Sequence, residues 1–162
     1  MEVVHLVSRG DASSSYAVWA YSGSPFSIDA LTVTVDKDIC LVGTGVLVGP
    51  GSTKFKMNVY DGTNAKGSTP IYTGDEMTFT RTSKNTDPIK YKLREGGVIL
   101  KANQLYTIEH HQKGPDSFKV YPAQTTVTQD GVTFKFGNAN QSPNHRRSTT
   151  GQIPCLWFQK TV

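Results

Sequence analysis

Cysteine, long apolar runs and helix formers are all scarce in this chain of 162 residues. The only cysteines, Cys40 and Cys155, have apolar neighbours and no ligand-spaced partners. They predict buried free thiols in a reducing compartment, with a disulfide as the alternative, and no metal site. No apolar run approaches the roughly 18 residues that span a bilayer, so membrane insertion is not expected. No basic-then-apolar segment opens the sequence, so we expect no signal peptide and a cytoplasmic location.

The shortage of helix formers predicts the fold class. Ala, Leu and Glu contribute eight, eight and four residues, whereas Thr and Val alone contribute 19 and 15. β-Branched and aromatic side chains favour strands, and 15 Gly and eight Pro supply turns. The composition therefore predicts an all-β protein.

Strict alternation of apolar and polar residues recurs along the chain. It covers residues 31–35, 54–59, 77–80, 89–94, 106–111 and 132–136. Each run predicts a strand with one buried and one solvated face, as antiparallel sheets have. Turn signals separate the runs by roughly 8–12 residues, which is typical of sandwiches and barrels. We predict one domain over residues 1–162: a two-sheet antiparallel β-sandwich, jelly-roll-like, with about ten strands. Residues 1–12 could be a flexible leader.

Motifs of catalysis and of phosphate binding are missing. The chain has no Gly-x-Ser-x-Gly elbow. The stretch Gly43-Thr44-Gly45 lacks the Gly-Lys-Ser/Thr ending of a phosphate loop and predicts a bulge or bend. His110 and His111 are adjacent on a predicted strand, so their rings point to opposite faces and cannot chelate one metal together. We expect one packed and one solvated histidine, no catalytic residue and no cofactor.

The net charge of +4 permits an anionic partner without requiring one. Basic residues fall on polar strand faces, where neighbouring strands would merge them into one basic surface. They are Lys54, Lys56, Lys90, Lys92 and Arg94. The aromatic residues of these strands point the other way, so no stacking platform for nucleic acid is expected. We therefore interpret these residues as solvated faces with edge-protecting lysines, and a functional basic surface is the alternative.

The longest irregular stretch, residues 137–151, carries the candidate partner site. It contains His145, Arg146 and Arg147, followed by two hydroxyl residues. The planar fork of arginine suits carboxylates on an acidic partner, and long loops inside compact domains are usually functional or disordered. We take these three residues, with Asp116 in an earlier turn, as candidate partner-binding residues.

Several short motifs, in order over about residues 16–158, resemble the PHR domain, which is named after the Pam and Highwire ubiquitin ligases. The positions that carry the resemblance are Trp19, Tyr21, Asp29, Gly43, Gly45, Gly114, Pro115, Gly151, Gln152 and Pro154. The resemblance assigns these residues to the structural motif of the fold. Val48-Gly49 stands where the family usually has Tyr-Gly, which marks a divergent member.

The resemblance implies a jelly-roll-like sandwich found in very large RING-type ligases and in BTB proteins that act as cullin-ligase adaptors. There the domain binds partners rather than catalyses. It therefore implies a non-catalytic protein–protein interaction module of a ubiquitin-ligase system, and we expect a monomer with protein partners. The alternative is a jelly-roll domain that binds a carbohydrate or a small anion, and an enzyme is a third possibility.

Overall fold

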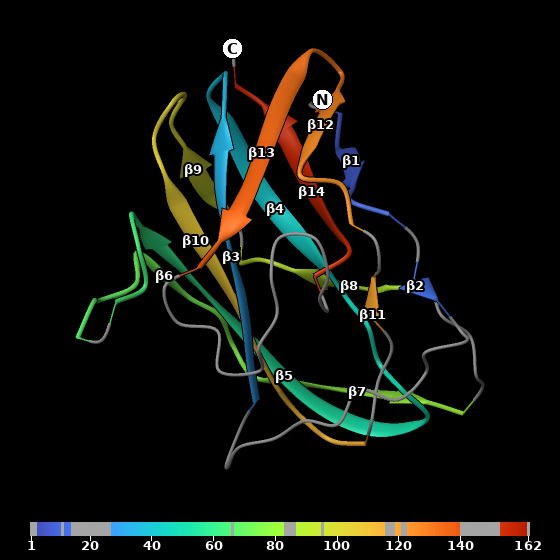
Figure 1. Ribbon diagram of the computed structural model, residues 1–162. Coiled ribbons are helices and arrows are strands. Elements are labelled where there is room, and N and C mark those ends of the chain that lie inside the picture. The colour runs from blue at the N-terminus through green and yellow to red at the C-terminus, as the bar shows by residue number, and fades with distance from the viewer. Residues whose placement is uncertain are drawn as a thin grey trace.

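The computed structural model describes residues 3–10, 12–13, 27–65, 67–82, 87–94, 96–115, 119–120, 123–139 and 153–161. Within these residues all regular secondary structure is β, and two antiparallel sheets form the body of the molecule (Figure 1). This confirms the predicted all-β sandwich. The described residues contain no helix long and apolar enough to cross a membrane.

The described chain has more strands than the ten or so expected. They are β1 (His5–Ser8), β2 (Ala12–Ser13), β3 (Ser27–Val35), β4 (Ile39–Val46), β5 (Gly51–Asp61), β6 (Tyr72–Thr73), β7 (Met77–Arg81), β8 (Ile89–Lys92), β9 (Val98–Leu100), β10 (Tyr106–Lys113), β11 (Lys119–Val120), β12 (Thr126–Gln129), β13 (Val132–Asn138) and β14 (Cys155–Lys160). Strands β2, β6 and β11 have two residues each, too few for alternation to reveal.

Two sheets and a small ribbon account for all of these strands. The five-stranded sheet has the order β1-β14-β4-β8, with β9 also paired to β4. The seven-stranded sheet has the order β12-β13-β3-β10-β5-β6, with β7 also paired to β5, and β2 pairs with β11. Every pairing is antiparallel. Residues 5–8 of the expected leader form β1, which pairs with β14, so this part of the leader belongs to the sandwich.

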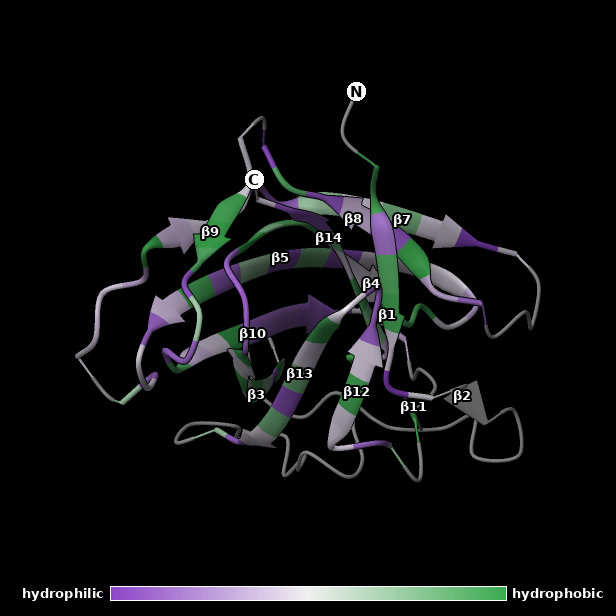
Figure 2. Cartoon of the chain, turned by 90° about the horizontal axis from the view of Figure 1, so that it is seen from above, coloured by the Kyte–Doolittle hydropathy of each residue, from purple (hydrophilic) through white to green (hydrophobic). Residues whose placement is uncertain are grey.

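The predicted alternation determines which side chains fill the core. Along β5 and β13 buried and more exposed residues alternate, and Figure 2 shows the same alternation as hydropathy bands. Aromatic rings from opposite sheets meet in the interior: Phe134 contacts Phe158 with ring centroids 4.9 Å apart, and Phe55 contacts Tyr91 at 4.8 Å. Fully burying one such side chain is worth about 1.5–3 kcal/mol, so these pairs bind the two sheets together.

One side of the sandwich is left open by the topology. Strand β7 lies on the outer side of β5 in one sheet, and β8 is an edge strand of the other. In the described part of the chain, no strand pairs with the outer side of β7 or of β8, so both are sheet edges. This open side holds the cavity described below.

Candidate partner-binding surface

The predicted partner-binding residues lie outside the described part of the chain. This applies to Asp116, His145, Arg146 and Arg147. It applies equally to four of the motif residues, namely Trp19, Tyr21, Gly151 and Gln152. Their assignment stays a prediction, and the geometry below concerns the other residues.

Gly43 and Gly45 lie where strands β8, β4 and β14 run side by side. The register of β4 against β14 shifts next to Gly43, which confirms the predicted irregularity in this stretch. A Cβ on Gly45 would lie 2.4 Å from the Cys155 sulfur, and one on Gly43 would lie 3.2 Å from the Tyr91 carbonyl oxygen. The two glycines therefore permit close approach of neighbouring groups, and Gly45 is the more tightly enclosed.

Three further motif residues make close contacts in the described chain. The Pro154 carbonyl accepts a 2.8 Å hydrogen bond from the Arg9 backbone N–H. Asp29 is buried, and its negative charge opposes the effect of burial on Arg9, whose pKa falls to about 10. Gly114 lies so close to Thr53 that a Cβ would meet its hydroxyl at 2.7 Å. Arg9, which sequence reasoning missed, is only 1% exposed, and no pattern around it distinguishes it from a surface arginine.

His110 and His111 point to opposite faces of β10, as predicted. The His110 ring is buried against Phe55 with centroids 4.8 Å apart, and its Nε2 lies 2.8 Å from the Thr44 hydroxyl. Burial, aided by the charges of His111 and Arg9, lowers the pKa of His110 to about 3. The expected solvated partner is wrong in degree: the His111 side chain is only 14% exposed, because Glu109 holds it.

Glu109 is the centre of a polar cluster on the outer face of the seven-stranded sheet. Its carboxylate accepts a 2.7 Å hydrogen bond from the Asn64 amide and contacts His111 Nε2 at 2.8 Å. Asn58 donates a longer bond of 3.4 Å. Burial would raise the pKa of Glu109, but the hydrogen bonds from His111 and Asn64 outweigh it and leave the pKa below its usual range. The carboxylate is thus ionised and fully engaged.

The basic residues that could have formed one surface are divided between the two sheets. Lys54 and Lys56 belong to β5, whereas Lys90 and Lys92 belong to β8. The β8 lysines do have an aromatic neighbour, since the Lys90 ammonium lies 5.0 Å from the centroid of the Trp157 ring on β14. Alternation within single strands could not show this contact, because it depends on which strands pair.

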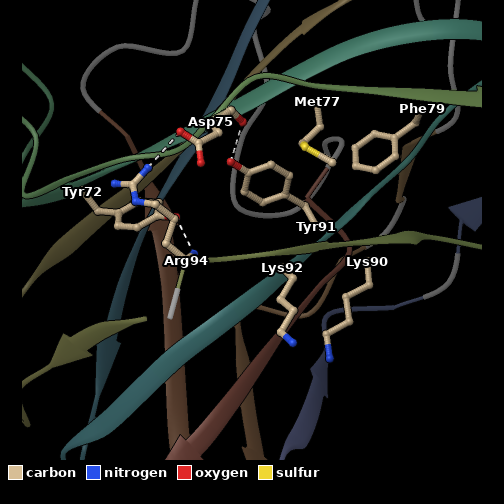
Figure 3. A pocket seen from close by; sticks show the side chains of 8 residues that line it. All are labelled: Tyr72, Asp75, Met77, Phe79, Lys90, Tyr91, Lys92 and Arg94. Carbon is tan, nitrogen blue, oxygen red and sulfur yellow. Dashed lines mark hydrogen bonds and ion pairs between the residues drawn. The ribbon is translucent and has the colours of Figure 1, made fainter. Parts of the chain in front are cut away.

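A cavity of about 180 Å³ lies on the open side, between β7 and β8. It is lined by Tyr72, Asp75, Met77, Phe79, Lys90, Tyr91, Lys92 and Arg94. Figure 3 shows Met77 and Phe79 pointing toward Tyr91, with Lys90 and Lys92 on the other side of β8. We call this site the edge cavity.

Hydrogen bonds fix the walls of the edge cavity. The Tyr91 hydroxyl donates to the Asp75 carbonyl oxygen at 2.7 Å, and the Arg94 backbone N–H donates to the Tyr72 hydroxyl at 3.0 Å. The Arg94 guanidinium lies 4.7 Å from the centroid of the Tyr72 ring and 3.3 Å from an Asp75 carboxylate oxygen. Burial, aided by Tyr72 and Asp75, raises the pKa of Tyr91 to about 12, so its hydroxyl remains a donor.

Comparison with known proteins matches the family model of the PHR domain to residues 10–159. The chain belongs to the PHR domain family. The resemblance inferred from the sequence motifs is thereby confirmed.

Two relatives of this PHR domain carry ligase names. It is 28% identical over 151 residues to "E3 ubiquitin-protein ligase MYCBP2" of Danio rerio and 26% identical over 147 residues to "E3 ubiquitin-protein ligase highwire" of Drosophila melanogaster. Each match covers 87% of this chain but 3% of the relative. The chain therefore spans only a small part of the length of these two relatives.

A second cavity of about 330 Å³ lies beside the first, on the outer face of the five-stranded sheet of this PHR domain. Its lining shares Lys90, Lys92 and Arg94 with the edge cavity and adds Val4 and Gln159. The two cavities together make the β8 edge a recessed and basic part of the molecular surface. Sequence reasoning noticed the lysines of β8 but had no means of locating the hollows beside them.

Proposed function

We propose that this PHR domain is a non-catalytic interaction module that recruits substrates or partners, in the cytoplasm, to a ubiquitin ligase of the Pam/Highwire type or to a BTB cullin adaptor. One observation carries the proposal: nearly the whole chain matches the PHR family, and its relatives are named E3 ubiquitin-protein ligases. A segment that makes up 3% of such a relative has the size of one domain, which suits recognition within a larger enzyme.

The chemistry of the described residues supports a role in binding. Glu109 and His111 are the pair most like acid–base machinery, since a carboxylate and an imidazole touch at 2.8 Å. The carboxylate is also held by Asn64, and neither residue lines the two cavities described above. A fully satisfied pair away from a cavity stabilises the fold rather than acting on a substrate.

The alternative function, binding of a carbohydrate or a small anion, has less support. Small-molecule sites typically measure about 300–1,000 Å³. The edge cavity, at about 180 Å³, is smaller than this range, and its neighbour, at about 330 Å³, is at the lower limit. Recesses of this size suit individual side chains of a protein partner.

Two measurements test the proposed function. The purified domain is cross-linked in cell extract, the captured proteins are identified, and each is then produced in pure form and titrated with the domain by calorimetry. We expect direct binding to at least one component or substrate of a ubiquitin-ligase complex. Absence of any direct protein binder, or ubiquitin transfer by the isolated domain with purified activating and conjugating enzymes, would contradict the proposal.

The predicted loop residues are tested with the same identified partner. Replacing both arginines, Arg146→Ala and Arg147→Ala, should weaken binding by about 1–3 kcal/mol if their charged hydrogen bonds contribute. The matched control is Lys135→Ala, a loss of charge at an exposed position on β13. Equal affinity in the folded double variant and the control would remove these arginines from the site.

A further inference from the structure

The edge cavity adjoins a row of backbone groups along β8 that pair with no strand in the described part of the chain. The Leu93 N–H donates to the Val42 carbonyl at 3.0 Å, and Tyr91 pairs with Thr44 two residues along the ladder. Hydrogen-bonded residues alternate in an antiparallel ladder, so Tyr91 directs its N–H and C=O toward β4. Lys90 and Lys92 consequently direct theirs away from β4, toward the open side. In the described part of the chain no strand pairs with this side of β8.

The charge that lines the edge cavity is mainly positive. Lys90, Lys92 and Arg94 line the edge cavity together with a single carboxylate, Asp75, which is paired with Arg94. In the described residues neither lysine has a carboxylate within ion-pair distance. Edge lysines discourage pairing with apolar strands because their charges would be desolvated. The same charges favour a strand that brings carboxylates.

The edge cavity can hold an apolar side chain on the face of β8 that carries Tyr91, opposite the face that carries the lysine side chains. Met77 is 48% exposed at its mouth, whereas Tyr91 is 3% exposed at its base. A cavity of about 150 Å³ accommodates a benzene-sized group, so about 180 Å³ accommodates one large apolar side chain. Since Tyr91 and the lysines lie on opposite faces of β8 (Figure 3), the edge distinguishes the two faces of an incoming strand.

We propose that β8 takes up an extended segment of a partner protein as an added strand, in which acidic residues alternate with apolar ones. The backbone of the segment pairs with Lys90 and Lys92. Its acidic side chains lie beside the lysine side chains, and an apolar side chain between them enters the edge cavity. Addition of a strand to an exposed sheet edge gives affinity through main-chain hydrogen bonds and specificity through alternate side chains. This inference rests on the proposed function, because it specifies the partner chemistry of an interaction module.

A synthetic peptide in which Glu alternates with Val and Leu is the probe. Fluorescence anisotropy should show saturable binding, with amide chemical-shift changes centred on Lys90 and Lys92. A peptide of the same composition with the Glu residues in one block, and one with N-methyl groups on alternate amides, should bind at least about tenfold more weakly. Equal binding of the N-methylated peptide would overturn the proposal, since it cannot complete a β-ladder.

Variants of the domain separate the backbone and charge contributions. Lys92→Pro removes an N–H that points away from β4, so β8 should keep its native pairing while the peptide loses at least about tenfold in affinity. The control Lys92→Ala keeps the N–H and should lose less. The double variant Lys90→Glu and Lys92→Glu should also lose at least about tenfold, whereas Lys135→Glu on the other sheet should match the wild type.

Other occupants of the edge give distinct results. A concentration-dependent dimer in sedimentation equilibrium that Lys92→Pro dissociates would overturn the proposal in favour of a second copy. Displacement of the peptide by single-stranded oligothymidylate at equal affinity would overturn it in favour of a general polyanion site. If a captured protein binds the domain in calorimetry but the peptide does not, the proposal for the β8 edge fails and the proposed function stands. If the peptide binds but no captured protein binds directly, the proposed function fails.

Discussion

The polar cluster around Glu109 and the β8 edge differ in how completely their polar groups are satisfied. Glu109 has His111, Asn64 and Asn58 around one buried carboxylate. Lys90, by contrast, has an aromatic face beneath its ammonium and no carboxylate within ion-pair distance in the described chain. Both regions carry charge beside ring side chains. The Glu109 carboxylate already accepts hydrogen bonds that stabilise the fold, whereas the β8 lysines can still pair with a carboxylate of a partner.

The first prediction tests whether the Glu109 cluster stabilises the fold. Glu109→Ala removes one acceptor of the buried Asn64 amide and the carboxylate that contacts His111, and we expect about 3 kcal/mol less free energy of unfolding in urea titrations. The matched control is Asp61→Ala, which removes an exposed carboxylate that accepts from Gln104 and should cost less than about 1 kcal/mol. Similar losses in both variants would show that the cluster is no more structural than the surface.

The second prediction concerns the two β4 glycines on the five-stranded sheet. Gly45→Ala places a methyl group 2.4 Å from the Cys155 sulfur and should cost about 2 kcal/mol through overpacking. Gly43→Ala meets its nearest neighbours at 3.2–3.5 Å and should cost less than about 1 kcal/mol. Thermal denaturation of both variants shows which one loses more stability. A larger loss in Gly43→Ala would contradict the packing described around Gly45.

The strands that carry the lysines show how far the sequence could predict the structure. Alternation located β3, β5, β7, β8, β10 and β13 because it reports which face of one strand is buried. It could not report which strands pair. Lys56 and Lys90 therefore seemed to belong to one surface although they lie in different sheets. The contact of Lys90 with Trp157 requires β4 between β8 and β14, which only the tertiary topology supplies.

Burial of polar residues was the second gap. Cys155 is buried as a free thiol, as expected, but Cys40 is only partly buried, because β4 turns it toward the outer face where Ile99 pairs beside it. Arg9 and Glu109 read as surface residues in the sequence, since charged side chains are almost never fully buried unless they are paired. Their partners, Asp29 and Asn64, are distant along the chain, so no local sequence pattern could predict these contacts.

A third prediction uses the low pKa of His110 to compare the interior with the surface. The pKa of His110 is about 3 in the folded state and about 6.5 in an unfolded chain, so between these values the unfolded state binds the extra proton. Stability should therefore fall as the pH drops below about 6.5, by up to about 2 kcal/mol between pH 7 and pH 5.

The variant His110→Gln isolates this contribution. Gln does not titrate, so the variant should be less stable at pH 7 but lose less stability between pH 7 and pH 5 than the wild type does. Urea titrations at the two pH values measure both differences. An unchanged pH dependence in the variant would mean that His110 is not the group responsible.

The smallest effect on stability is expected at the β8 edge, where it sharpens the contrast with Glu109. Lys90→Ala removes a cation from the Trp157 ring, an exposed interaction worth about 0.5–1 kcal/mol, so the free energy of unfolding should fall by no more than that. Affinity for the alternating acidic peptide should fall more than stability does, because Lys90 has no carboxylate partner within the described domain to lose.

Glu109→Gln, which keeps the shape of the side chain and removes its charge, should show the opposite balance, with reduced stability and unchanged peptide affinity. Urea titrations measure the loss of stability in each variant, and anisotropy titrations measure the loss of peptide affinity. An equal ratio of the two losses in both variants would contradict the distinction between the Glu109 cluster and the β8 edge.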